Sequence, residues 1–161
     1  MDEVRFASAI AQMRVLAPQA FPGSVAEATI QEAQSELSVT VPESYIAFLR
    51  EAGGADFPFD IYGLEPEQPN SDDVSAWNVV GMTQEERTEV EPQMQHHLVA
   101  LCPDGVGNHW CLDTLRIHDG DCPVVMWLHD AAADQVPPLM NGTFVEFLES
   151  SIENAEEMME F

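Results

Sequence analysis

Apolar residues recur along the first third of this chain at the spacing of α-helices. Phe6, Ile10 and Met13 follow one another at intervals of four and three residues, which predicts a helix over Val4–Leu16. A second helix is predicted from positions that share this spacing: Ala26, Ile30, Ala33 and Leu37. The breaks at Ala17-Pro18 and Phe21-Pro22-Gly23 separate the two helices.

The stretch Val39–Gly54, VTVPESYIAFLREAGG, contains start and stop signals for a third helix. Pro42 suits a first helical turn, where a missing backbone N–H costs nothing. The apolar residues of one helical face follow: Tyr45, Phe48, Leu49 and Ala52. Gly53 and Gly54 then supply the backbone freedom that ends a helix. We expect this helix to pack beside the second one.

The second half of the chain changes to short apolar runs that are separated by turn sequences. Strands are predicted over Leu98–Cys102, His109–Asp113 and Val124–Leu128, with turns at Pro103-Asp104-Gly105 and Asp119-Gly120. Three consecutive strands with short turns form an antiparallel meander. A further short strand is predicted over Ile61–Leu64, and a linker over Ala131–Pro138.

Three Ser/Thr-x-x-Glu sequences predict helix starts through capping boxes: Ser24 with Glu27, Thr83 with Glu86, and Thr143 with Glu146. The Thr83 box opens a short acidic helix that ends near Pro92, and the Thr143 box opens the closing helix. Helices first, then strands, then a helix predict one α+β domain. We expect a twisted, largely antiparallel sheet with helices packed mainly on one face.

The order of these elements resembles the SUKH superfamily, the group that includes the yeast killer-toxin-resistance and cell-wall regulator. The motifs that carry the likeness are Leu37-x-Val39-x-Val41-Pro42-x-x-Tyr45-x-x-Phe48-Leu49, Gly53-Gly54, Ile61-Tyr62-Gly63-Leu64, Gly107–Thr114, Pro123-Val124-Val125-x-Trp127 and Phe144-x-x-Phe147-Leu148. The likeness covers roughly residues 24–150. Residues 1–23 are then an N-terminal helical extension, and 151–161 the acidic end of the last helix. Most members resemble bacterial immunity proteins that neutralise polymorphic toxins.

Charge is the outlying property of the composition. The 161 residues hold 29 Asp and Glu against five arginines and no lysine, which gives a net charge of −24. Such a field repels nucleic acid and anionic membranes and attracts basic partners, although acidity also serves solubility. Three cysteines without a C-x-x-C pair fit a reducing cytosol. No signal peptide or membrane span is predicted, so we expect a cytoplasmic protein, and the family resemblance implies a bacterial one.

A metal-dependent enzyme is one alternative. His109, Cys111 and Asp113 share one face of the predicted strand, and a zinc site needs three or four such ligands. No recognised ligand spacing is present, and Trp110 and Leu112 on the other face are the expected core residues. A partly exposed polar face is the simpler interpretation. The cysteines are likewise expected to be buried and structural, and we expect neither catalytic residues nor a cofactor nor a metal.

The resemblance implies a non-enzymatic immunity protein that binds a cognate, basic toxin and covers its active site. From charge and loop position we predict the partner-binding residues to be Glu65, Glu67, Asp72, Asp73, Trp77, Glu85, Glu86 and Glu89. Glu91 belongs with the last three, and the terminal carboxylates Glu156, Glu157 and Glu160 are a further choice. A regulatory adaptor of the same fold is the main alternative. We expect a monomer or weak homodimer.

Overall fold

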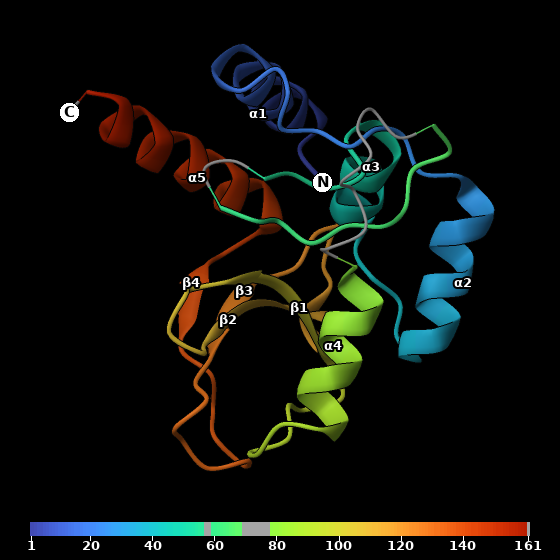
Figure 1. The fold of residues 1–161 in the computed structure, drawn as a ribbon, viewed down its shortest axis with the longest axis vertical. Helices are drawn as coiled ribbons and strands as arrows, with labels where there is room; N and C mark the ends of the chain where they lie inside the picture. The colour runs from blue at the N-terminus through green and yellow to red at the C-terminus, as the bar shows by residue number, and fades with distance from the viewer. Residues whose placement is uncertain (57–58, 69–77, 161) are drawn as a thin grey trace.

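The computed structural model describes residues 1–56, 59–68 and 78–160 (Figure 1). Its α-helices are α1 (Glu3–Leu16), α2 (Glu27–Leu37), α3 (Glu43–Glu51), α4 (Val79–Thr88) and α5 (Phe144–Met159). Its strands are β1 (Leu98–Pro103), β2 (His109–Asp113), β3 (Val124–Trp127) and β4 (Leu139–Asn141). The strands form one antiparallel sheet in the order β1-β2-β3-β4. The predicted α+β fold is therefore confirmed.

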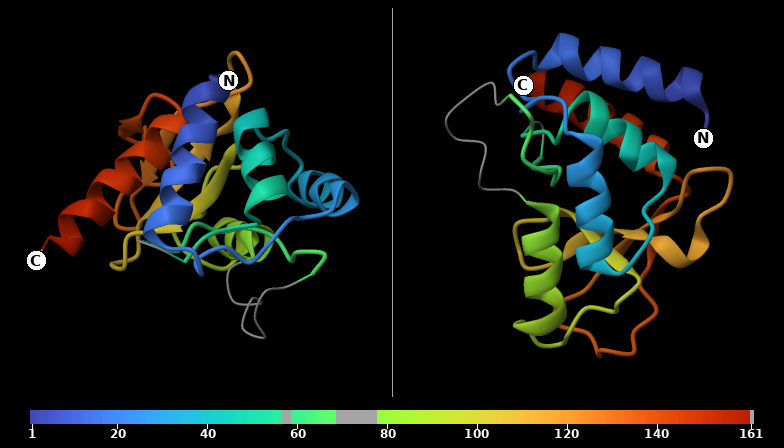
Figure 2. Two further views of the ribbon diagram at one scale, coloured as in Figure 1. Left: turned by 90° about the horizontal axis from the view of Figure 1, so that it is seen from above. Right: turned by 90° about the vertical axis from the view of Figure 1, so that its right-hand side faces the viewer.

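Helices α1, α3 and α5 lie together above the sheet, whereas α4 lies beside β1 (Figures 1 and 2). The N-terminal extension is part of this layer, because α1 packs along α5 and buries Phe6, Ile10 and Met13. An ion pair joins the two helices, with Arg5 Nε 2.9 Å from Glu149 Oε1. Strand β1 is buried on both faces, since every residue of Leu98–Cys102 has an exposed fraction of 0%.

One strand prediction is wrong, and one strand of the sheet was not predicted. Ile61–Leu64 is not a strand of the sheet; Ile61 and Gly63 form only isolated bridges, to Ala55 and Asn78. The sequence also gave no sign of β4, because the prolines before it suggested a linker. β4 is three residues long and does not alternate buried with exposed positions.

One of the three predicted capping boxes is confirmed. Thr143 Oγ1 accepts from Glu146 N at 3.0 Å, and Glu146 Oε2 accepts from Gly142 N at 2.8 Å. The other two are wrong. Helix α2 begins after Ala26 without a side-chain cap, and α4 is capped by Asn78, which accepts from the N–H groups of Val80 and Gly81. Tertiary contacts move Thr83 into the middle of the helix.

The outer edge of β1 is covered by groups from α4 and from the segment before it. Tyr62 N donates to Leu101 O at 2.7 Å, and Ala100 N donates to Thr83 Oγ1 at 3.0 Å. Arg87, which is 4% exposed, donates to Leu98 O at 3.0 Å. Backbone groups on a free sheet edge would otherwise invite pairing with another chain, so these contacts close the β1 edge.

Asp121 joins the sheet to two helices. Its carboxylate is 5% exposed and accepts from Ser44 Oγ at 2.8 Å and from Phe144 N at 2.9 Å. Ser44 lies in the first turn of α3, and Phe144 is the first residue of α5. A carboxylate at a helix N-terminus is favoured by the helix dipole and by the unpaired N–H groups there. The loop between β2 and β3 thereby positions both helices.

Three passes of the backbone cross at glycines. Gly23 N donates to Ala52 O at 3.0 Å, and Leu64 N donates to Gly53 O at 3.0 Å. A Cβ atom on Gly63 would lie 1.7 Å from Gly53 O, and one on Gly53 would lie 2.1 Å from Gly23 O. Gly53 also has a φ of 76°, in the left-handed region predicted for the end of α3. The approach therefore requires glycine at both positions.

We predict that Gly63→Ala lowers the free energy of unfolding by at least about 3 kcal/mol, because the backbone carbonyl of Gly53 cannot move aside without opening the crossing. The matched control is Gly81→Ala in α4, where the new methyl group meets no described atom within 4 Å. That change should stabilise the protein by about 0.5–1 kcal/mol. Urea unfolding measures both, and equal midpoints for the two variants would contradict the packing argument.

Candidate functional site

The predicted partner-binding residues fall into separate parts of the structure. Glu65 and Glu67 are exposed on the segment that leaves the glycine crossing, and Glu67 N donates to Ser24 O at 3.0 Å. Asp72, Asp73 and Trp77 lie outside the described residues. This part of the prediction therefore stays a prediction.

Helix α4 presents two of the predicted carboxylates to solvent and turns a third inward. Glu85 and Glu89 are exposed, whereas Glu86 is only 8% exposed. Its neighbour Arg87 is buried against the carbonyls of Leu37 and Leu98. Glu86 is therefore not part of an acidic outer surface. Glu86 is turned about 100° from Glu85 around the helix, toward the side that packs on the sheet, and charge alone could not reveal this.

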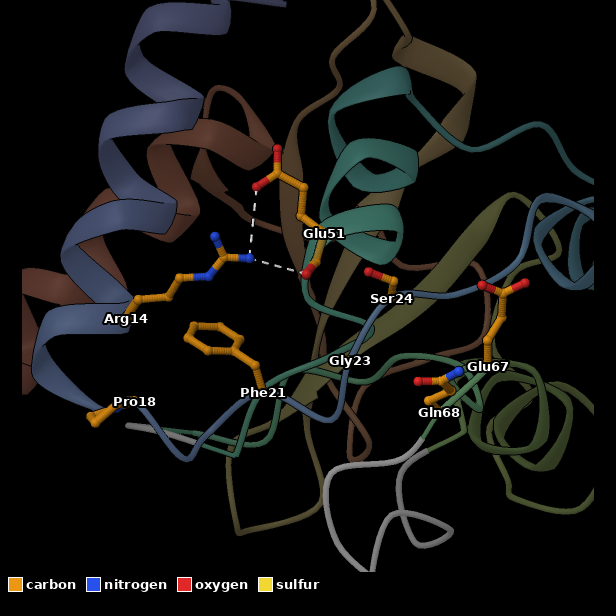
Figure 3. Close-up of a pocket in the computed structure, with 8 residues that line it drawn as sticks. All are labelled: Arg14, Pro18, Phe21, Gly23, Ser24, Glu51, Glu67 and Gln68. Atoms are coloured by element: carbon orange, nitrogen blue, oxygen red, sulfur yellow. Dashed lines mark hydrogen bonds and ion pairs between the residues drawn. The ribbon is translucent and has the colours of Figure 1, made fainter.

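An open pocket of about 680 Å³ lies between the ends of α1 and α3 and the segment that carries Glu67 (Figure 3). Its lining residues are Arg14, Pro18, Phe21, Gly23, Ser24, Glu51, Glu67 and Gln68. On one side, Arg14 Nη2 donates to Glu51 O at 3.1 Å, and its guanidinium lies 5.9 Å from the centre of the Phe21 ring. Glu67 and Gln68 stand on the other side. Among the described residues that line the pocket, Arg14 is the only cation, and its guanidinium is already engaged by Glu51 and Phe21.

Behind α4, Glu86 belongs to a buried polar cluster with His109 and Tyr62. Tyr62 Oη lies 3.3 Å from His109 Nε2, and His109 Nδ1 lies 3.8 Å from Glu86 Oε1. His109 Nδ1 and Glu86 Oε2 have no hydrogen-bond partner among the described residues. Burial raises the pKa of Glu86 and lowers the pKa of His109, because both charged forms lose hydration. Both side chains are therefore pushed toward their neutral forms.

The structure corrects the prediction of a partly exposed polar face on β2. His109, Cys111 and Asp113 are all buried, and Trp110 on the opposite face is only partly buried. The ring of Trp110 stacks on Phe59, with centroids 6.1 Å apart. The reason is that β2 is a central strand whose polar face is covered by Tyr62 and α4. The predicted core position of Leu112 is confirmed, whereas that of Trp110 is met only in part.

These groups do not form a metal-binding cluster within the described residues. No set of three His, Cys, Asp or Glu side chains there could hold a metal ion. Asp113 instead accepts from Arg116 Nε at 2.7 Å. Burial raises the pKa of both Cys102 and Cys122 to about 12, so neither thiol provides a thiolate near neutral pH. The three cysteines are buried and unpaired, as predicted.

All five arginines are engaged within the fold. Four form ion pairs with carboxylates: Arg5 with Glu149, Arg14 with Glu51, Arg50 with Glu27 and Glu43, and Arg116 with Asp113. The fifth, Arg87, donates to backbone carbonyls. The positive charges are therefore neutralised locally or buried, and the many remaining carboxylates determine the field that a partner meets.

We predict that Glu86→Gln changes how stability depends on pH. Because the pKa of Glu86 is raised by burial, the folded chain holds this proton more tightly than the unfolded chain, and the contribution of Glu86 to stability falls as pH rises. Removing that loss should stabilise the variant relative to wild type more at pH 7.5 than at pH 4. Urea unfolding at both pH values measures this. Glu85→Gln on the exposed face is the control, and an equal pH response would contradict the burial argument.

The SUKH_6 family model, described as SMI1-KNR4 cell-wall, matches residues 27–148. The match runs from the start of α2 into the first turn of α5 and includes Gly53 and Gly63 of the glycine crossing. The search of curated proteins found no match. No helix in the described part of the chain is long and apolar enough to cross a membrane. The match covers most of the chain, and the chain belongs to the SMI1-KNR4 family of the SUKH superfamily, which is generally non-enzymatic.

Proposed function

We propose that this protein is an immunity protein, which binds a cognate toxin domain and covers a basic active-site cleft with an acidic surface. Family membership is compatible with such a role. The observation that carries the proposal is the distribution of charge. The chain has a net charge of −24, and its five arginines are all engaged within the fold.

The charge asymmetry suits a partner that acts on nucleic acid. Phosphate contacts dominate nucleic-acid binding, so a toxin of that kind needs a cleft lined by Lys and Arg. The field of this protein would draw such a cleft in and speed its association. The same negative field would repel nucleic acid, so the protein would not itself bind the toxin's substrate.

The function is tested by expressing the reading frame that adjoins this gene, alone and together with this chain, and counting surviving colonies. We expect the frame to kill and this chain to restore growth. Co-expression of the Gly63→Ala variant is the control, because this variant should fold poorly and so lack the native binding surface. Killing that wild type leaves unchanged would overturn the proposal. Binding to several unrelated proteins would favour a regulatory adaptor.

We predict that the association rate of the complex falls at least about tenfold between 50 and 500 mM NaCl, with a smaller change in the dissociation rate. The reason is that salt screens the long-range field but leaves the short-range contacts of the bound state largely intact. Stopped-flow mixing with an active-site-inactivated toxin domain measures both rates. An association rate that is independent of salt would show that the acidity does not steer binding.

A further inference from the structure

The chain exposes an unbroken apolar run at residues 136–140, Val-Pro-Pro-Leu-Met. Val136 is 92% exposed, Leu139 59% and Met140 44%, and Pro138 is exposed as well. Single exposed apolar residues are ordinary on a protein surface. A run of five consecutive apolar residues with four of them exposed is unusual, and such runs usually mark an interaction site.

This run leads into β4, the outermost strand on the side of the sheet away from β1. Neighbouring residues of a strand point to opposite faces, and yet Leu139 and Met140 are both exposed. In the described structure, therefore, neither side of β4 is covered at these positions. The β1 edge differs, because α4 lies beside it (Figure 1) and Thr83 and Arg87 of that helix form hydrogen bonds with its backbone.

The β4 edge is poorly suited to pairing with another strand. Pro137 and Pro138 have no backbone N–H to donate, and the register shifts between the pairs at Val124 and Val125. Prolines and bulges are the devices that keep sheet edges from joining. What this edge offers a partner is apolar side chains.

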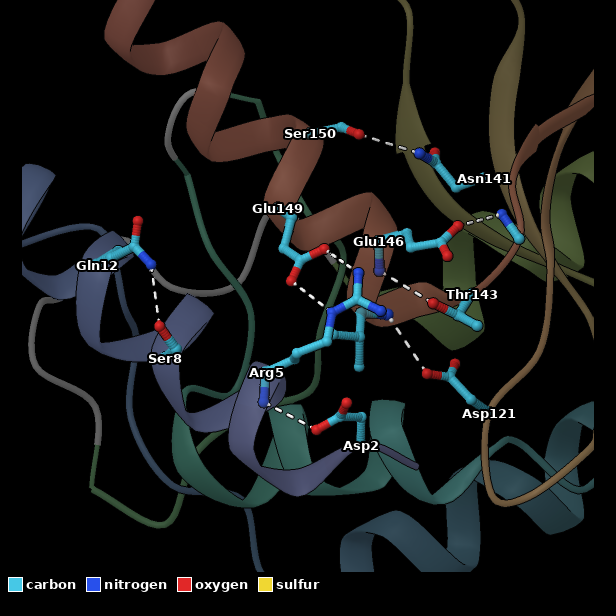
Figure 4. Close-up of polar contacts among 12 residues, drawn as sticks. Asp2, Arg5, Ser8, Gln12, Asp121, Asn141, Thr143, Glu146, Glu149 and Ser150 are labelled. Atoms are coloured by element: carbon cyan, nitrogen blue, oxygen red, sulfur yellow. Dashed lines mark hydrogen bonds and ion pairs between the residues drawn. The ribbon is translucent and has the colours of Figure 1, made fainter.

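Carboxylates flank the apolar run on both sides. Asp130 and Asp134 are exposed in the loop before it. After it, Asn141 Nδ2 donates to Ser150 Oγ at 3.1 Å, which holds β4 against α5 (Figure 4). On the same helix, Glu146 precedes Ser150 by one turn, and the exposed Glu153 follows it by almost one turn.

We propose that the β4–α5 edge is the docking surface for the toxin domain, an inference that rests on the proposed function. We define this edge by Val136, Leu139 and Met140 with the carboxylates Glu146 and Glu153. Its occupant has an apolar patch surrounded by Lys and Arg side chains. A second copy of this chain is a poor occupant, because it would bring like carboxylates together around the apolar residues.

The described part of the surface predicted from charge and loop position, which does not include Trp77, lacks one ingredient of a tight interface. Within 59–68 and 78–95, no large apolar side chain is exposed in the described structure. Binding energy concentrates on a few large, desolvated side chains, and peripheral charges mainly set the association rate. The β4–α5 edge combines both kinds of group. It also lies across the sheet from Glu85 and Glu89, so separate variants can distinguish the two surfaces.

The test compares three variants for binding to the active-site-inactivated toxin domain by calorimetry. Leu139→Ser combined with Met140→Ser should weaken binding by at least about 30-fold, in the range of a hot-spot loss. Val15→Ser on α1, which changes a residue that is 82% exposed, is the matched apolar control and should change Kd less than about twofold. Glu85→Gln with Glu89→Gln removes the charge on α4 and should leave Kd within about threefold. Urea unfolding confirms that each variant is folded.

The outcomes separate the two proposals. Loss of affinity and of colony protection only in the Leu139/Met140 variant supports docking at the β4–α5 edge. Full affinity in that variant, with loss in the Glu85/Glu89 variant, overturns this surface and leaves immunity standing. A wild-type chain that neither binds nor protects overturns both. Sedimentation that shows a wild-type dimer, abolished by Leu139→Ser, would assign the edge to self-association instead.

Discussion

The crossing of three backbone passes at Gly23, Gly53 and Gly63 sets the positions of the elements around it. Gly53 ends α3 in a left-handed conformation, and its carbonyl lies where any side chain on Gly63 would have to be. Because Leu64 and Val79 are hydrogen-bonded to this crossing, it fixes where α4 begins. Helix α4 in turn supplies the groups that cover β1. A local backbone requirement thus decides which edge of the sheet is closed.

The two edges of the sheet are treated in opposite ways. At β1, the backbone groups are satisfied by Tyr62, Thr83 and Arg87, and burying the arginine there removes one of the few positive charges from the surface. At β4, prolines discourage strand pairing while apolar side chains remain exposed. An edge that resists strand pairing and still exposes apolar side chains is suited to binding a partner protein.

The sequence predicted the elements that depend on local signals and missed those that depend on tertiary contacts. The helix around Tyr45, the meander of β1 to β3 and the Thr143 cap follow from periodicity and capping, and all three are present. Thr83 has the local signature of a cap, but its hydroxyl serves the edge of β1. The inward turn of Glu86 depends on packing that no local pattern encodes. For the candidate site, charge indicated an acidic surface but could not show which carboxylates are exposed or where apolar side chains accompany them.

Acidity and apolar exposure have to act together for an inhibitor of this kind. A surface of carboxylates alone attracts many basic proteins, so it gives speed without much selectivity. An apolar centre alone would promote self-association, which the surrounding charge opposes. At the β4–α5 edge, the carboxylates repel other copies of the chain, and the apolar residues stabilise a complex only with a partner whose shape fits them. Selectivity therefore requires both groups on one face, and the β4–α5 edge has both.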